Sequence, residues 1–180
     1  MIIGFPNAGK STLISRISNA RPKVAGYPFT TLVPNLGIVK LEEGESFVAA
    51  DIPGLIEGAH KGKGLGHQFL RHIERTRLLL HLIDFSDVET ENILDRYHKL
   101  QKELKAFSKD LYQKPQILVA TKMDVPQSLS NFQNIVPLMN ELNPFLFTIS
   151  SVTGEGIEKL IWKIKECLTA KKLIEEKKEL

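Results

Sequence analysis

The order of apolar segments along the chain predicts an α/β fold: a mostly parallel six-stranded sheet with helices on both faces. Two observations support this prediction. Strand-like runs alternate with helix-like patterns along the chain, and 180 residues suffice for one buried core. Strands are expected at residues 1–3, 34–41, 46–51, 78–84, 116–121 and 145–149. Helices are expected at 11–19, 66–77, 90–108, 129–142 and 155–169. In such a fold, ligands bind at the C-terminal ends of the strands.

The first strand runs directly into a glycine-containing loop, residues 4–11, which reads G-F-P-N-A-G-K-S and precedes the first helix. This matches the phosphate-binding pattern G-x-x-x-x-G-K-[ST] in its strand–loop–helix setting. The glycines let backbone N–H groups point inward, Lys10 adds a positive charge, and the hydroxyl of Ser11 can ligate Mg²⁺. The expected contacts are Gly4, Phe5, Pro6, Asn7, Ala8, Gly9, Lys10, Ser11 and Thr12. The loop predicts binding of a nucleoside triphosphate.

Two segments between the first helix and residue 54 are candidates for sensing the terminal phosphate. The run Y-P-F-T-T-L at 27–32 carries Phe29, Thr30 and Thr31. Either threonine can close on Mg²⁺ and the γ-phosphate, although β-branched residues also favour the start of a strand. Asp51 ends a buried strand and can hold Mg²⁺ through water, and Gly54 offers a backbone N–H to the γ-phosphate.

The strand at 116–121 ends in Thr121-Lys122-Met123-Asp124. The Asp124 carboxylate can accept hydrogen bonds from the N1–H and N2–H₂ groups that guanine has and adenine lacks. Lys122 can lay its alkyl stem along the base. After the last strand, Ser150, Ser151 and Val152 form a loop in which a backbone N–H can reach the guanine O6. The predicted nucleotide is therefore GTP.

The motifs resemble those of the Obg family of GTPases, from Gly4 to about Ile164. The matching segments are G-F-P-N-A-G-K-S-T-L (4–13), Y-P-F-T-T-L-V-P-N-L-G (27–37), D-I-P-G-L-I-E-G-A (51–59) and G-L-G-H-Q-F-L-R-H-I-E-R-T-R-L-L-L-H (64–81). The resemblance implies a Ras-like P-loop NTPase domain, with Thr31 as the Mg²⁺ ligand besides Ser11 and Asp51. Thr121 departs from the usual asparagine, as in Rho-like GTPases.

The resemblance also implies where catalysis is incomplete. Ras-like proteins carry a water-orienting glutamine where this chain has Leu55, so hydrolysis is expected to be slow. Related loops use the residue at Asn7 to bind K⁺, and Glu57 is a second candidate for positioning water. The expected catalytic residues are Lys10, Asn7, Thr31 and Gly54.

The resemblance implies a wider biological setting as well. Residues 1–170 are expected to form the GTP-binding domain with a truncated first strand, and residues 171–180 a charged helical tail. A glycine-rich N-terminal domain of the family is absent from this chain, which is expected to be a piece of a longer protein. The implied function is a switch in the assembly of the large ribosomal subunit and in stress response, in a monomer. Two alternatives stay open: a sensor that binds guanosine tetraphosphate and hydrolyses GTP only incidentally, and a P-loop ATPase or kinase, against which Asp124 argues.

Composition sets further expectations. A net charge of +3, one cysteine, and no signal peptide or membrane-length apolar run favour a cytoplasmic protein without disulfides. Basic side chains gather after Gly54, where they either contact ribosomal RNA or form a solvated face: Lys61, Lys63, Arg71, Arg75 and Arg77, with His60, His67 and His72. In the last helix, Ile157, Leu160, Ile161, Ile164 and Leu168 share one face. Trp162 and Cys167 are expected to serve packing nearby.

Overall fold

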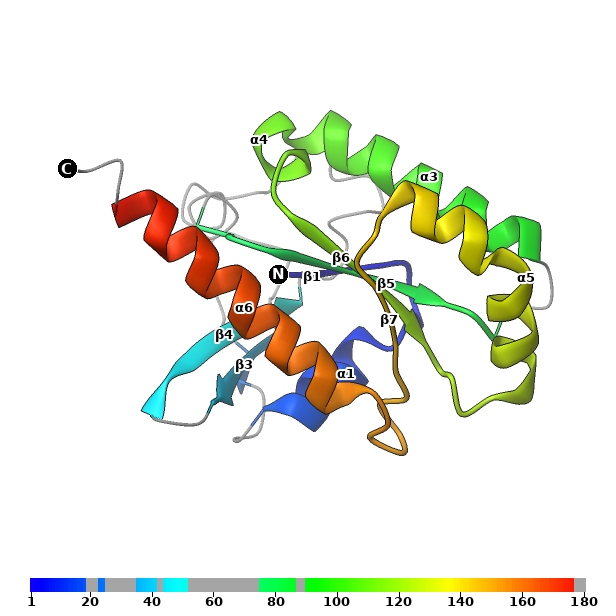
Figure 1. Cartoon of the computed structure of the whole chain (residues 1–180), viewed down its shortest axis with the longest axis horizontal. Helices are drawn as coiled ribbons and strands as arrows, with labels where there is room; N and C mark the ends of the chain where they lie inside the picture. The colour runs from blue at the N-terminus through cyan, green and yellow to red at the C-terminus, as the bar shows by residue number, and fades with distance from the viewer. Residues whose placement is uncertain (19–22, 25–34, 42–43, 52–74, 87–89, 177–180) are drawn as a thin grey trace.

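The computed structural model describes residues 1–18, 23–24, 35–41, 44–51, 75–86 and 90–176. Within these ranges, the strands form a central sheet that is flanked by helices (Figure 1). The strands are β1 (Ile2–Ile3), β2 (Lys23–Val24), β3 (Asn35–Lys40), β4 (Ser46–Asp51), β5 (Leu79–Asp84), β6 (Gln116–Thr121) and β7 (Leu146–Thr148). The helices are α1 (Lys10–Ile17), α3 (Thr90–Phe107), α4 (Lys109–Tyr112), α5 (Pro126–Leu142) and α6 (Ile157–Glu176).

The strands form one sheet in the order β2-β3-β4-β1-β5-β6-β7. β1 pairs in parallel with β4 on one side and β5 on the other, and β6 and β7 continue the parallel arrangement. Among the described strands, β3 runs antiparallel to the rest and pairs with β4 on one side and β2 on the other. The predicted α/β class with six main strands is therefore confirmed, and the two-residue β2 extends the sheet at the β3 edge.

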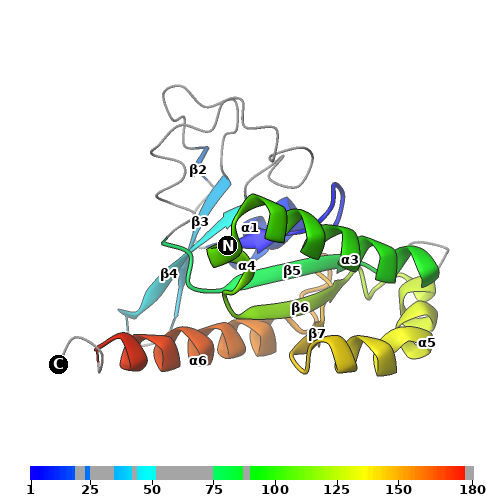
Figure 2. The ribbon, with the colours of Figure 1, turned by 90° about the horizontal axis from the view of Figure 1, so that it is seen from above.

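The two faces of the sheet bury separate apolar clusters. On one face, α1 and α6 pack against the sheet through residues such as Leu13, Ile14 and Leu160, which are fully buried. On the other face, α3 and α4 cover β5, and α3 and α5 cover β6. Figure 2 shows α3 and α6 on opposite sides of β5 and β6. The helices thus cover both faces and leave the C-terminal strand ends for the site.

Element boundaries differ from the prediction where local chemistry decides them. α5 begins at Pro126 rather than near residue 129, because proline is well accommodated in the first turn of a helix. The short α4 was not predicted; its N-cap is Ser108, whose Oγ accepts a hydrogen bond from the Leu111 N–H at 3.1 Å. α6 continues to Glu176, so the predicted tail is largely an extension of this helix. The predicted helix at 66–77 lies mostly outside the described residues.

Packing of α6 confirms the predicted apolar face but corrects the expectation for Trp162. Ile157, Leu160 and Ile164 are buried, and Cys167 packs half-buried against the same core. Trp162, in contrast, is 51% exposed and lies off the buried face. None of the helices in the described part of the chain has the length and apolar character needed to cross a bilayer.

A titratable side chain is buried in the middle of β5. His81 is 1% exposed, stacks on Tyr97 with ring centroids 5.4 Å apart, and accepts a hydrogen bond at Nδ1 from Gln101 Nε2 at 3.3 Å. Burial lowers the pKa of His81 from its ordinary value of 6.5 to about 3. The side chain is therefore neutral in the folded protein at pH 5, whereas it is protonated in the unfolded chain.

This difference predicts acid sensitivity of the fold. The pKa of His81 is lower in the folded protein than in the unfolded chain. Above pH 6.5 the side chain is neutral in both states, so the fold keeps its full stability. As the pH falls from 6.5 toward 3, only the unfolded chain takes up the proton, and the free energy of unfolding decreases. The loss should approach about 1.4 kcal/mol per pH unit. Urea unfolding of wild type and His81→Phe at pH 7.5 and 5.0 measures it, since the variant keeps a ring against Tyr97 but cannot titrate. An equal loss of stability in both proteins would contradict the prediction.

Candidate nucleotide-binding site

The predicted phosphate loop connects the end of β1 to the start of α1 and needs unusual backbone angles. Gly9, which precedes the helix as its N-cap, has φ 86°, and Asn7 has φ 63°. A Cβ on Gly4 would lie 2.6 Å from the Leu82 carbonyl oxygen, so only glycine fits beside β5. Because α1 begins at Lys10, its N-terminal N–H groups and positive dipole end face the loop.

The Lys10 side chain folds back over this loop. Its Nζ donates hydrogen bonds to the carbonyl oxygens of Gly4 and Phe5, each at 3.0 Å. The positive charge is thereby held beside the backbone N–H groups of the same loop. An anion bound here would meet both kinds of donor.

The two predicted Mg²⁺ ligands described by the structure lie next to each other. Ser11 Oγ donates to Asp51 Oδ2 at 3.4 Å, although 40 residues separate them in the sequence. Asp51 is 2% exposed. Burial raises the pKa of Asp51, while the Lys10 charge and hydrogen bonds from Ser11 and Asn35 oppose this shift. Asp51 Oδ1 is buried without a hydrogen-bond partner among the described residues. A buried carboxylate oxygen next to a hydroxyl fits a hard divalent cation such as Mg²⁺.

The predicted base-binding end is tied to the phosphate loop by a buried threonine. Thr121 Oγ1 lies 3.0 Å from the Ala8 carbonyl oxygen and 3.1 Å from that of Ile83. The Met123 N–H donates to the Ile149 carbonyl oxygen at 3.1 Å, which places the Asp124 segment beside the Ser150 segment. The side chain of Asp124 is exposed at this edge.

A second aspartate, which sequence reasoning missed, belongs to the same edge. Asp84, the last residue of β5, forms an ion pair with Lys122 at 2.5 Å. Burial alone would raise the pKa of Asp84, but hydrogen bonds from Lys122 and Ser86, with the Lys122 charge, lower it below the ordinary value. Lys122 itself has φ 59°, an uncommon left-handed conformation for lysine. The position of Asp84 at the C-terminal end of a buried strand was the available signal.

The loop after β7 is shaped by its own hydrogen bonds. Ser150 is buried, and its Oγ accepts from the Thr153 N–H at 3.0 Å. A Cβ on Gly156 would lie 2.1 Å from the Thr148 carbonyl oxygen, so glycine is required at the start of α6. Ser151 is half-buried and the Val152 side chain is 72% exposed.

Several predicted site residues fall outside the described ranges: Phe29, Thr30, Thr31, Gly54, Leu55 and Glu57. The same holds for most of the predicted basic surface, of which Arg75 and Arg77 are described and exposed. The structure therefore brings together the phosphate loop, Asp51 and the segments at 121–124 and 150–152.

Comparison with known proteins agrees with this geometry. Residues 1–122 match the family described as 50S ribosome-binding GTPase. GTPase Obg of Syntrophomonas wolfei is 54% identical over 94% of this chain, and that of Solibacter usitatus is 57% identical over 88%. The chain spans only 40% and 47% of the lengths of these relatives.

Solved structures show the same fold at low identity. The G domain of the T. maritima FeoB iron transporter aligns with a TM-score of 0.63 at 22% identity, covering 93% of this chain and 96% of that one. Aquifex aeolicus Era bound to GDP and AlF₄⁻ aligns with a TM-score of 0.63 at 22% identity, covering 91% and 54%. The predicted resemblance to the Obg GTPases is confirmed by the relatives above, and the chain belongs to the 50S ribosome-binding GTPase family.

Proposed function

We propose that this chain binds guanine nucleotides with Mg²⁺ and hydrolyses GTP slowly, as a switch in the assembly of the large ribosomal subunit. The observation that carries the proposal is the meeting of the phosphate loop with Asp51. Lys10 and Ser11 lie at the start of α1, and Ser11 Oγ is 3.4 Å from the Asp51 carboxylate. Membership of the 50S ribosome-binding GTPase family supports the choice of reaction.

Phosphate binding in this proposal is the task of the loop at 4–11. Its backbone N–H groups and the Lys10 ammonium would donate hydrogen bonds to the β- and γ-phosphate oxygens. Ser11 and Asp51 would hold Mg²⁺, with Thr31 as a further ligand implied by the family resemblance. When bound, the ion neutralises charge on the phosphates. The Gly54 N–H is proposed to contact the γ-phosphate.

Guanine selection is assigned to Asp124, whose exposed carboxylate lies at the base-binding edge. It would accept two hydrogen bonds from the base, and the half-buried Ser151 would offer its N–H to O6. The hydrogen bond from Thr121 to the Ala8 carbonyl holds this edge in a fixed position beside the phosphate loop. Base and phosphates would thus bind to one connected unit.

The catalytic weakness is Leu55, which cannot orient water. Asn7 is the residue that we propose as partial compensation. Its side chain is exposed at the turn of the phosphate loop, where the backbone takes a left-handed conformation. An amide oxygen at this place can hold K⁺ beside the phosphates and add a positive charge.

The proposed partners follow from the family. The large ribosomal subunit, through its RNA, is the proposed binding partner, and guanosine tetraphosphate is a proposed competitor of GTP. Residues 1–170 are proposed as the GTP-binding domain and 171–180 as a charged tail, in a monomeric cytoplasmic protein.

The guanine contact can be tested by Asp124→Asn. The variant loses two hydrogen bonds to guanine, so GDP affinity should fall about 100-fold or more. Xanthine carries a C2 carbonyl in place of the amino group, and an asparagine amide can donate to it. Binding of fluorescent GDP and xanthosine diphosphate measures both effects, with Asp95→Asn on the exposed face of α3 as the matched control. Unchanged GDP affinity in Asp124→Asn would refute the assignment.

The cation role of Asn7 predicts faster hydrolysis in K⁺ than in Na⁺. An arginine finger is worth about 10³ to 10⁵ in rate, so a cation that does part of its task should give at least about a tenfold rise. Asn7→Ala and Asn7→Gly should both lose this rise. Glycine tolerates the positive φ of this position, so it separates loss of the amide from backbone strain. Single-turnover hydrolysis provides the rates, and a rise that persists in Asn7→Gly would overturn the role.

The switch itself predicts that ribosome binding depends on the nucleotide. Co-sedimentation of the chain with purified 50S subunits should be stronger with a non-hydrolysable GTP analogue than with GDP. Purified 30S subunits serve as the control particle. Equal sedimentation with both nucleotides would argue against a switch at this partner.

A further inference from the structure

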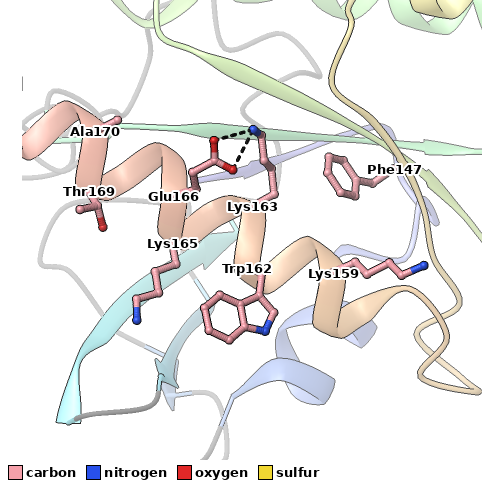
Figure 3. Close-up of a pocket in the computed structure, with 8 residues that line it drawn as sticks. All are labelled: Phe147, Lys159, Trp162, Lys163, Lys165, Glu166, Thr169 and Ala170. Carbon is pink, nitrogen blue, oxygen red and sulfur yellow. Dashed lines mark hydrogen bonds and ion pairs between the residues drawn. The ribbon is translucent and has the colours of Figure 1, made fainter.

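The only tryptophan of the chain, Trp162, lies on the exposed side of α6 among lysine side chains. Trp162 is 51% exposed, and its ring projects from α6 between the side chains of Lys165 and Lys159 (Figure 3). Trp162 lines two open depressions, of about 780 and 370 Å³. We call the residues Phe147, Lys159, Trp162, Lys163, Lys165 and Glu166 the Trp162 surface.

Positive charge exceeds negative charge in both depressions. Lys159, Lys163 and Lys165 line the larger one, with Glu166 as its acidic residue. Arg16, Lys40 and Lys165 line the smaller one, with Glu158. A polyanion approaching this side of α6 would therefore meet a net positive potential around an aromatic ring.

The existing contacts of these lysines are weak enough to be exchanged. Lys163 pairs with Glu166 at 3.0 Å and lies over the Phe145 ring, and Lys165 pairs with Glu45 at 3.3 Å. The glutamates are more than half exposed, whereas both lysine side chains are less than one quarter exposed. A glutamate partner that faces water is screened by solvent, so a phosphate oxygen can replace it beside the lysine. Lys165 Nζ also lies 5.4 Å from the Trp162 ring centroid, a contact worth about 0.5 to 1 kcal/mol at an exposed site. A stacked nucleic-acid base gains about 1 to 3 kcal/mol, which is more than the displaced contact.

We propose that the Trp162 surface binds single-stranded RNA, with an unpaired base stacked on Trp162 and neighbouring phosphates beside Lys159 and Lys165, which flank the ring (Figure 3). The proposal rests on the proposed function for the kind of partner, since a ribosomal particle carries exposed RNA. Apart from the lining residue Lys165, which also borders a pocket with Arg75 and Arg77, the residues of this surface are distinct from those of the nucleotide site and of the predicted basic surface.

The chemistry of the surface favours RNA over an acidic peptide. A helical peptide needs several apolar anchors spaced along a groove, whereas this surface offers one half-exposed aromatic ring with Phe147 at its margin. A single aromatic ring with flanking cations is the arrangement that holds one base of a single strand. The surface also lies close to the nucleotide site: Gly154 lines the smaller depression, and Arg16 Nη2 donates to the Thr153 carbonyl oxygen at 3.3 Å.

The test uses the full chain and a fluorescein-labelled 12-nucleotide oligouridylate. Because Trp162 is the sole tryptophan, its emission reports stacking directly and should be quenched to saturation. RNA anisotropy should show that Trp162→Leu weakens binding about 5- to 150-fold, while Trp162→Phe retains most of it. Lys159→Gln should lower the slope of log affinity against log salt by about 0.7. Lys99→Gln, an exposed lysine on α3, should bind as wild type does.

Three results would overturn the proposal. Trp162→Leu could bind the oligonucleotide as tightly as wild type, inorganic polyphosphate could compete as well as RNA and leave the emission unchanged, or a poly-glutamate peptide could bind where RNA does not. GDP binding is measured in every variant and should stay unchanged. A wild-type chain that binds RNA but not GDP would refute the proposed GTPase function and leave the RNA site standing. A wild-type chain that binds GDP but not RNA would refute only the RNA site.

Discussion

The parallel pairing of β1 with β4 on one side and β5 on the other is the constraint on which the site depends. Ile2 is in register with Asp51 and with Leu80, so the phosphate loop leaves the sheet between the ends of two strands that carry carboxylates. Asp51 then meets Ser11, and Asp84 holds Lys122 at the end of β5. A shift of β1 by one residue would move its side chains to the opposite face and separate Ser11 from Asp51, whereas the contact of Asp84 with Lys122 depends on the pairing of β5 with β6.

The site concentrates polar groups that the fold does not fully satisfy. Burial disfavours the charged form of the Asp51 carboxylate and so raises its pKa. One of its oxygens also lacks a hydrogen-bond partner within the described ranges. Positive φ angles occur at Asn7 and Lys122, one in each half of the site. Such costs persist where the surrounding structure enforces them, and they mark places prepared for a ligand. Here the ligand would be a nucleotide with its ion.

Prediction from sequence was most reliable for features that depend on neighbours along the chain. The six main strands, the helices that became α1, α3, α5 and α6, and the apolar face of α6 follow from spacing alone, and the structure reproduces them. The predicted helix at 66–77 lies mostly outside the described residues, and β2 and α4 were not predicted. Boundaries moved where a cap or a proline decided them, as at Ser108 and Pro126. The roles of Thr31 and Gly54 stay predictions, since these residues lie outside the described part of the chain.

The sequence by itself determined the fold class and the phosphate-loop pattern, because each depends on local periodicity or fixed spacing, whereas guanine recognition stays a prediction. Only the tertiary structure decided which distant groups meet. The pairing of Asp84 with Lys122, the contact of Thr121 with Ala8 and the burial of His81 all depend on strand order and register. The exposure of Trp162 was decided in the same way: its position on α6 turns it away from the core, which leaves the side chain 51% exposed.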